Sequence, residues 1–307
     1  MANKIHPSAI IGAQVQLGDG NEIGPGCVLE DGVVLGSRNR LWMNVYLGPG
    51  TRLGDDNQVH MGAVIGHVPQ DLAFTGAPSA TTIGSRNTIR EYVTIHRGTK
   101  EGSSTVIGDD NFLMANVHLG HNCQVGHRTA LVNLTTLAGY CVVDDGAILS
   151  GMVVVHQFTR IGQLAMVSGL SAVNKDVPPY MLCGGRPAVI QGLNVVGLRR
   201  AGLSAAVRED IKRAYKFLYR EGLSVPHALE AIERKCNTSE VKRLVEVVKS
   251  SQRGICAGIG SDETEEGESI LPRKPSPRHG LGSGRGSGPR SAGYESRGGQ
   301  VAARGED

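Results

Sequence analysis

Aliphatic residues recur at every sixth position along most of the chain. The series runs from Ile5 to Val173, and only three positions break it: Asp71, Ala77 and Glu101. A small or slim side chain follows most members of the series after four positions. Neither the helical period of 3.6 nor the strand period of two produces a repeat of six, whereas a parallel β-helix of stacked coils does. The pattern therefore predicts a mainly β fold in which both sets of side chains face inward.

Two interruptions divide this series. Segments 67–82 and 97–106 carry Pro, Gly and polar residues at places where a coil could have continued. We predict loops ejected from the β-helix, because insertions of this kind often build the binding face of a solenoid. Asp71 is the charged residue of the first loop best suited to contact a ligand, although a solvated loop carboxylate explains it equally well.

The pattern changes after about residue 190. Apolar residues at three-to-four spacing follow candidate N-cap residues in three segments, at Ser204, at Ser224, and at Thr238 or Ser239. We therefore predict a β-helix over residues 1–190 and a small α-helical C-terminal domain over 191–255 that covers its open end. Residues 256–307 are rich in Gly, Ser and Arg and nearly lack aliphatic residues, which predicts a disordered tail.

Composition narrows the class of protein. Glycine accounts for 43 of the 307 residues and aromatic residues for only 4%, so the core must be narrow or built by repetition. The net charge of +3 is too small to indicate a nucleic-acid partner. No apolar run is long enough to span a membrane and no signal peptide is recognisable, so we expect a cytoplasmic protein. The six cysteines form no CxxC pair, which favours free thiols.

The hexads resemble those of left-handed β-helix acyltransferases, which follow the pattern [LIV]-G-x-x-[small]-x. In that superfamily three hexads form one triangular coil, so equivalent positions recur at i and i+18. The left hand is taken from the resemblance, since parallel crossovers are otherwise almost always right-handed. Equivalent positions are then expected to stack at about 4.8 Å, the spacing of neighbouring strands.

A coil of three hexads brings several polar residues together on the outside of the prism. His121 lies two positions after a member of the aliphatic series, and steps of one coil lead to Gly139 and Gln157, with His156 beside them. Histidine titrates near neutral pH and is a natural general base. A glycine amide with no side chain over it is a natural oxyanion donor. This column therefore predicts acyl transfer to a hydroxyl group.

A zinc site is the main alternative explanation of the histidines. Zinc enzymes also carry histidines on left-handed β-helices, and three imidazoles with a water form a catalytic zinc set. His118 and His121 are three apart on an extended chain, however, so they point to different faces. One ion would need ligands from a neighbouring subunit. We therefore predict no metal and keep a zinc-dependent hydrase as an alternative.

Longer motifs are more specific than the hexads: QDL at 70–72, IREYVTIHRGT at 89–99, LMANVHLGHNC at 113–123, GMVVVHQF at 151–158 and GLNVVGLRR at 192–200. Over about residues 3–255 the chain resembles the UDP-N-acetylglucosamine O-acyltransferase family of lipid A biosynthesis. The resemblance implies a homotrimer with active sites between adjacent β-helices. It also implies transfer of a (3-hydroxy)acyl group to the 3-hydroxyl of a UDP-sugar. The donor would be the 4′-phosphopantetheine thioester of an acyl carrier protein, with no further cofactor.

The same resemblance assigns roles to individual residues. It makes His121 the general base and Gly139 the oxyanion donor. Substrate contacts are expected from the following side chains: Asp71, His96, His118, Tyr140, His156 and Gln157. Asn194 and Arg200 would hold the nucleotide or the pantetheine arm. Gly169 falls where the family uses side-chain size to end the acyl pocket, and glycine there implies a long acyl chain.

Five positions depart from the family pattern: Ala73, Asn122, Tyr140, Val196 and Ala201. The family has lysine at position 73, a carboxylate at 122, often histidine at 140, an acidic residue at 196 and arginine at 201. Loss of the carboxylate removes one way of holding an imidazolium, although an amide oxygen can still orient a ring N–H. Loss of the lysine and the arginine weakens contacts to phosphate or uracil. The acceptor is thus open between a 3-hydroxyl group and the 3-amino group of a diamino-sugar variant.

Overall fold

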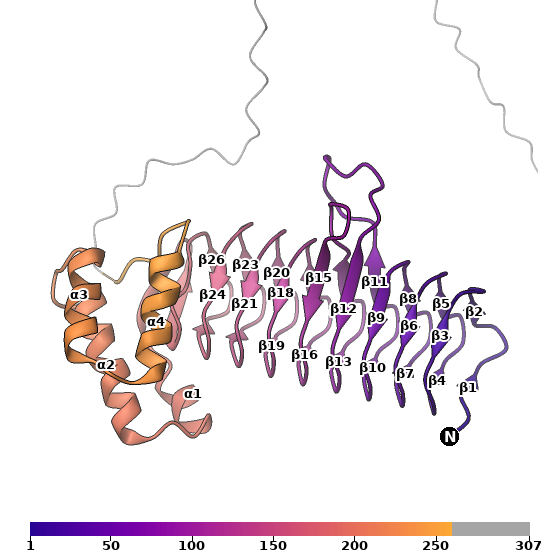
Figure 1. Ribbon diagram of the computed structural model, residues 1–307, viewed down its shortest axis with the longest axis horizontal. Coiled ribbons are helices and arrows are strands. Elements are labelled where there is room, and N and C mark those ends of the chain that lie inside the picture. The colour runs from indigo at the N-terminus through magenta and orange to yellow at the C-terminus, as the bar shows by residue number, and fades with distance from the viewer. Residues whose placement is uncertain (260–307) are drawn as a thin grey trace, which may run out of the picture. The chain divides into compact units, whose positions relative to one another are not determined.

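The computed structural model describes residues 1–259 as a left-handed parallel β-helix followed by a group of α-helices (Figure 1). Three flat sheets form the sides of the triangular prism, and their neighbouring coils pair in parallel. The predicted fold class is confirmed. An all-parallel solenoid satisfies its backbone hydrogen bonds between coils, so very short strands suffice.

Each sheet takes every third strand of the β-helix. The first sheet contains β1 (Lys4–Ile5), β4 (Glu22–Ile23), β7 (Arg40–Leu41), β10 (Gln58–Val59), β13 (Thr88–Ile89), β16 (Phe112–Leu113), β19 (Ala130–Leu131), β22 (Ile148–Leu149), β25 (Met166–Val167), β27 (Met181–Gly185) and β28 (Ala188–Leu193). The second contains β2 (Ile10–Ile11), β5 (Val28–Leu29), β8 (Tyr46–Leu47), β11 (Val64–His67), β14 (Thr94–His96), β17 (His118–Leu119), β20 (Thr136–Leu137), β23 (Val154–Val155) and β26 (Ala172–Val173). The third contains β3 (Gln16–Leu17), β6 (Val34–Leu35), β9 (Thr51–Leu53), β12 (Ala80–Ile83), β15 (Ser104–Ile107), β18 (Gln124–Val125), β21 (Val142–Val143) and β24 (Arg160–Ile161).

The two ejected loops leave the prism between β11 and β12 and between β14 and β15 (Figure 1). Leu53 pairs with Ile83 at a sequence offset of 30, and Ile83 pairs with Ile107 at an offset of 24. Uninterrupted coils of the β-helix pair at an offset of 18. The first loop therefore adds two hexads and the second adds one. Because both additions are whole hexads, the hydrophobic spacing survives them in the sequence.

The aliphatic series forms the core of the prism. From Ile23 to Val173 its Ile, Leu and Val side chains are at most 3% exposed. Ile5 is 42% exposed, because no coil lies beneath the first one. Cys27 and Cys141 occupy slim inward positions and are fully buried, as predicted, and both are free thiols.

A column of buried asparagines, which we call the asparagine ladder, runs along one edge: Asn21, Asn39, Asn57, Asn87 and Asn111. Each side-chain Oδ1 atom accepts the backbone N–H of the next member at 2.9 Å. The last Oδ1 accepts from the N–H and the hydroxyl of Thr129. The ladder satisfies turn amides that would otherwise be buried without a partner.

The helical region follows the antiparallel pair β27 and β28. Its helices are α1 (Val195–Arg200), α2 (Ala205–Tyr219), α3 (Val225–Lys235) and α4 (Ser239–Ser250). Ser204, Ser224 and Thr238 occupy the N-cap positions of α2, α3 and α4, as the sequence predicted. The apolar faces of these three helices pack on one another.

The chain returns to the β-helix after α4. The Ser251 hydroxyl donates to Asp176 at 2.6 Å, and Gly258 forms a bridge with Ile190. Cys256, the first residue of the predicted tail, is 1% exposed. From residue 260 onward the predicted tail lies outside the described residues. In residues 1–259, none of the helices has the length and apolar character needed to cross a bilayer.

Candidate active site

His121, Gly139 and Gln157 form a column along the edge between the second and third sheets, which we call the site edge. Each lies two positions beyond the paired strands β17, β20 and β23, so the coil of three hexads stacks them as predicted. The backbone N–H of Tyr140 donates to the His121 carbonyl at 2.9 Å. The N–H of Phe158 donates to the Gly139 carbonyl at 3.1 Å. Rigid coil backbone therefore sets the spacing of the candidate groups.

Gly139 lies directly beneath the imidazole of His121. A Cβ atom at this position would collide with the ring atoms Cε1 and Nε2, so only glycine fits. The expectation of an exposed glycine is wrong, because Gly139 is buried and the imidazole ring lies against its Cα atom, where a side chain would otherwise stand. Close packing thus places the candidate base and the candidate oxyanion donor at the same point.

The backbone N–H of Gly139 makes no hydrogen bond within the described residues. Equivalent N–H groups at the edge between the third and first sheets are capped by side chains of the next coil. Asp55 accepts from the Ser37 N–H at 2.7 Å, and Asp109 accepts from the Ser85 N–H at 2.7 Å. In residues 1–259 no side chain caps the Gly139 N–H in this way, so the group is free to bind developing negative charge.

The first ejected loop covers His121 from outside the prism. His121 points away from the core as expected, yet it is only 7% exposed. The Oδ2 atom of Asp71 lies 3.6 Å from His121 Nε2, and Asp71 Oδ1 accepts the Ala73 N–H at 2.9 Å. Asp71 is therefore no solvated loop carboxylate: it faces the nitrogen that a general base would use.

Asn122 and Tyr140, two of the departures from the family pattern, both contact His121. Asn122 Oδ1 lies 3.1 Å from His121 Nδ1. The Tyr140 ring meets the His121 ring edge to face at 5.2 Å and stacks on Phe158 at 5.0 Å. Both Asn122 and Tyr140 have positive φ angles, near 60°, which turn their side chains along the site edge. Phe158 was not predicted, because stacking of exposed turn residues leaves no periodic signal.

His96 and His118 lie close together on the second sheet, with ring centroids 5.1 Å apart. Burial lowers the pKa of His96 to about 4, and the neighbouring imidazoles act in the same direction. Its Nδ1 accepts the Gln70 N–H at 3.1 Å, which ties the first ejected loop to the prism. Burial also lowers the pKa of His118, whose Nδ1 lies 2.7 Å from Thr94 Oγ1. Within residues 1–259 no three His, Cys, Asp or Glu side chains are arranged to hold a metal ion.

His156 and Gln157 lie at the C-terminal end of the column. His156 is exposed, and its Nδ1 lies 3.1 Å from the Gln157 carbonyl oxygen. A carbonyl oxygen only accepts, so Nδ1 carries the proton and Nε2 is open to an incoming group. These two residues are accessible to a substrate that reaches His121 along the site edge.

Three predicted residues lie apart from the histidine cluster. Asn194 caps α1 through its Oδ1, which accepts the Gly197 N–H at 3.0 Å, while its Nδ2 donates to the Leu164 carbonyl. Its side chain therefore has a structural role that the sequence did not predict. Arg200 is exposed at the end of α1. Gly169 is exposed at the edge between the first and second sheets, so in a single chain it does not share an edge with His121.

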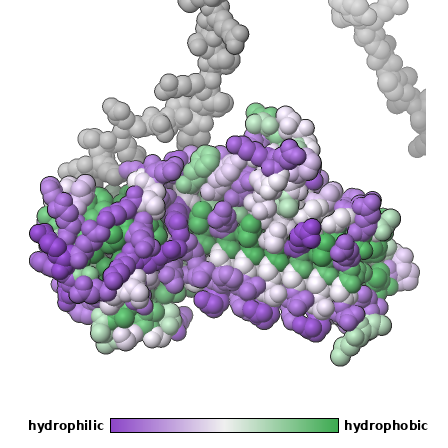
Figure 2. Space-filling model, in the orientation of Figure 1, coloured by the Kyte–Doolittle hydropathy of each residue, from purple (hydrophilic) through white to green (hydrophobic). Residues whose placement is uncertain are grey.

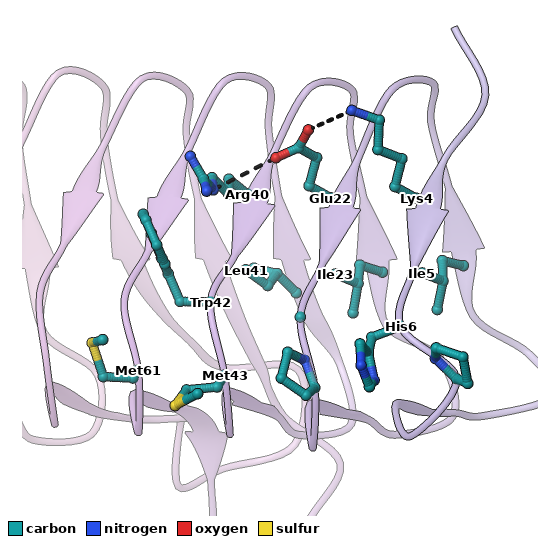
Figure 3. A pocket seen from close by; sticks show the side chains of 13 residues that line it. Lys4, Ile5, His6, Glu22, Ile23, Arg40, Leu41, Trp42, Met43 and Met61 are labelled. Carbon is teal, nitrogen blue, oxygen red and sulfur yellow. Dashed lines mark hydrogen bonds and ion pairs between the residues drawn. The ribbon is translucent and has the colours of Figure 1, made fainter.

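A groove of about 730 Å³ lies on the first four coils, away from this cluster (Figure 3). Lys4, Glu22 and Arg40 form one rim, where the Glu22 carboxylate pairs with both cations, and Met43 and Met61 line the other side. On the face seen in Figure 2, hydrophilic residues gather over the helical region and a hydrophobic band runs along the β-helix. The groove contains none of the column residues.

Comparisons with known proteins agree with this architecture. A family model described as UDP-N-acetylglucosamine O-acyltransferase, domain 2, matches residues 176–256. An acyl-[acyl-carrier-protein]–UDP-N-acetylglucosamine O-acyltransferase of Gloeothece citriformis is 43% identical over 190 residues, which cover 62% of this chain and 69% of the relative. The chain belongs to the UDP-N-acetylglucosamine O-acyltransferase family.

Solved structures of this family align with the chain over nearly their whole length. The UDP-N-acetylglucosamine acyltransferase of Bacteroides fragilis is 37% identical with a TM-score of 0.79, and the alignment covers 82% of this chain and 99% of that one. The enzyme of Francisella novicida is 36% identical with a TM-score of 0.81, covering 83% and 95%. The protein is thus an acyltransferase of this family, built on the predicted β-helix.

Proposed function

We propose that this chain transfers a (3-hydroxy)acyl group from acyl carrier protein to the 3-position of UDP-N-acetylglucosamine, the first step of lipid A biosynthesis. The relatives are named for an acyl carrier protein donor and a UDP-N-acetylglucosamine acceptor. The observation that carries the proposal is the placement of His121. Its Nε2 faces Asp71 across 3.6 Å, and its ring packs against the Cα atom of Gly139, whose backbone N–H has no cap within the described residues.

His121 acts as the general base in this mechanism. Its Nε2 takes the proton of the acceptor hydroxyl as the hydroxyl oxygen attacks the thioester carbonyl carbon. The C–S bond then breaks, and the imidazolium returns the proton to the thiolate of the phosphopantetheine arm. Asp71 stabilises the imidazolium between these two steps, a function that a carboxylate at position 122 would otherwise serve.

Gly139 acts as the oxyanion donor. Its N–H binds the charge that develops on the thioester oxygen, and the burial of Gly139 strengthens this interaction by limiting the access of water. His156 and Gln157 extend the column and bind the substrates as they enter. His118, tied to Thr94, supports the wall of the site. His96 acts indirectly, because it anchors the loop that carries Asp71.

The proposal includes a homotrimer with active sites between β-helices. Large apolar side chains project from the edge between the first and second sheets: Tyr92, Leu134, Met152 and Leu170, each between 48% and 62% exposed. Leu134, Met152 and Leu170 lie on successive coils, and an exposed apolar row of this kind favours contact with another subunit. Gly169 lies on this same edge, so it reaches the acyl chain only where the edge meets the site edge of a neighbouring copy. The nucleotide contact of Arg200 would likewise come from a neighbouring chain.

A thioester-cleavage assay with purified protein tests the proposal. Hydroxyacyl carrier proteins of several chain lengths serve as donors, with UDP-N-acetylglucosamine and its 3-amino analogue as separate acceptors. We expect turnover with UDP-N-acetylglucosamine, a preference for long chains, and a trimer in light scattering. Turnover with the 3-amino analogue but not with UDP-N-acetylglucosamine would identify the 3-amino sugar as the acceptor. Absence of transfer to either sugar would refute the proposal.

A further inference from the structure

Thr99, in the second ejected loop, contacts both residues that depart from the family pattern beside His121. Its backbone N–H donates to Asn122 Oδ1 at 3.1 Å, and its hydroxyl donates to the same atom at 3.0 Å. The Thr99 hydroxyl oxygen also lies 3.1 Å from the Tyr140 hydroxyl. The loop thus reaches the candidate base through a single amide side chain.

The direction of these hydrogen bonds fixes the orientation of the Asn122 amide. A backbone N–H can only donate, so the atom that faces Thr99 must be the amide oxygen. That oxygen is also the atom that lies 3.1 Å from His121 Nδ1. His121 Nδ1 must then be the protonated ring nitrogen, which leaves the Nε2 lone pair free to take a proton.

An amide at position 122 needs such orientation, whereas a carboxylate does not. The two oxygens of a carboxylate are equivalent, and either one accepts from His121 Nδ1. The two ends of an amide differ. If the Asn122 amide flipped, its NH₂ group would donate to His121 Nδ1. The imidazole would then carry its proton on Nε2, and Nε2 could no longer take a proton from the acceptor hydroxyl. The Thr99 hydroxyl donates to Asn122, so its own lone pair accepts from the Tyr140 O–H. The N–H and hydroxyl of Thr99, the His121 Nδ1–H and the Tyr140 hydroxyl thereby each have an acceptor.

We infer that Thr99 is a positioning residue that selects the active tautomer of His121 by fixing the amide of Asn122. The inference rests on the proposed function, because it presupposes that His121 Nε2 is the base. It gives the second ejected loop a role in catalysis, and it explains how asparagine serves where the family pattern has a carboxylate. Tyr140 completes the network as a donor to Thr99.

A double-mutant cycle tests this inference with the full chain, UDP-N-acetylglucosamine and a hydroxyacyl carrier protein. Thr99→Val keeps the shape and the backbone N–H but removes the hydroxyl donor. We expect kcat to fall about three- to tenfold, the effect of one neutral hydrogen bond, with KM for both substrates within twofold. Thr99→Ser retains the hydroxyl and should restore kcat to the wild-type range.

The decisive comparison is Thr99→Val in the Asn122→Asp background. Because both oxygens of a carboxylate accept equally well, its orientation does not need to be fixed. Thr99→Val should therefore lower kcat less than twofold in the Asn122→Asp background. Asn122→Asp should also move the acidic limb of the kcat/KM profile to higher pH, because a carboxylate favours the imidazolium. An equal loss in both backgrounds, or no loss in either, would overturn the inference.

The outcomes separate this inference from the proposed function. Full activity in His121→Ala would refute the base itself and the inference with it. An inactive His121→Ala together with an unaffected Thr99→Val would refute the inference alone. If valine at position 99 impairs folding, as judged by the melting temperature, Tyr140→Phe replaces it. That variant removes the donor to Thr99, so it should lower kcat in the otherwise wild-type chain and have less than a twofold effect in the Asn122→Asp background.

Discussion

The imidazole of His121 packs over the Cα atom of Gly139, so the candidate base and the candidate oxyanion donor occupy one point on successive coils. The absence of a side chain at position 139 is required sterically. Among the described residues, the backbone N–H of the same residue has no side-chain cap from the next coil, so both features arise at one residue. Most of the chemistry proposed for this chain follows from that single contact.

Gly139→Ala should lower kcat/KM about 100-fold. The added Cβ must displace the His121 ring, and a misplacement of about 1 Å at a catalytic group costs roughly this much. Gly192→Ala is the control, because a Cβ added at Gly192 meets nothing within 4 Å. Steady-state kinetics of both variants checks the prediction, and equal activity would contradict the packing argument.

As the pH is lowered from about 6.5 to about 4, the free energy of unfolding should decrease, in part because of His96. The pKa of His96 is lowered from 6.5 to about 4 in the folded chain. The unfolded chain therefore binds a proton in this window that the folded chain does not, and the free energy of unfolding decreases as the pH falls. Denaturant unfolding at pH 7 and pH 5 measures the change.

His96→Asn is the matched variant for this measurement. Asparagine offers an oxygen to the Gln70 N–H and does not titrate, so the difference between pH 7 and pH 5 should be smaller than in the wild type. His118, whose pKa burial also lowers, keeps its contribution in both proteins. An identical pH dependence in wild type and variant would contradict the role assigned to His96.

Asn57→Ala should destabilise the β-helix by about 1 to 3 kcal/mol, the cost of leaving a buried N–H without an acceptor. Asn57 bridges the coil that carries the first ejected loop, since its Oδ1 accepts from the backbone N–H of Asn87. Gln58→Ala, at the exposed neighbouring position, should change stability by less than about 0.5 kcal/mol. Thermal or denaturant unfolding of the two variants tests the asparagine ladder, and equal stability would contradict its role.

Charge reversal on α2 should weaken use of the acyl carrier protein. Lys212 and Lys216 are exposed on this helix, and a basic surface suits an acidic carrier. The double variant Lys212→Glu/Lys216→Glu should raise KM for the carrier at least fivefold and leave kcat within twofold. Lys242→Glu/Lys249→Glu, on α4, is a control of equal charge change. An unchanged KM in the α2 variant would place the docking surface elsewhere.

The fold was predictable because the hexad rule is local. One inward aliphatic residue per six fixes the coil, and the two ejected loops keep its phase because they add whole hexads. The column of His121, Gly139 and Gln157 followed from the same spacing. These features depend on periodicity alone, which the sequence displays directly.

The surroundings of His121 could not be predicted, because they depend on the path of the ejected loops. Asp71 faces the imidazole and Gln70 binds His96 only once the first loop folds back on the prism. Asn194 illustrates the converse, since its place in a family motif suggested a ligand contact while local geometry makes it the cap of α1. The path of a loop and the hydrogen bonds of a helix cap leave no repeating pattern in the sequence. The residues that they bring together are therefore seen only in the structure.

The pH–rate profile of His121→Ala beside that of His227→Ala tests the central claim most directly. His227 is an exposed histidine on α3 and serves as the matched control. We predict that His121→Ala lowers kcat/KM about 10² to 10⁴-fold and loses the acidic limb of the profile, while His227→Ala behaves as wild type. Wild-type turnover with an intact acidic limb in His121→Ala would contradict the account.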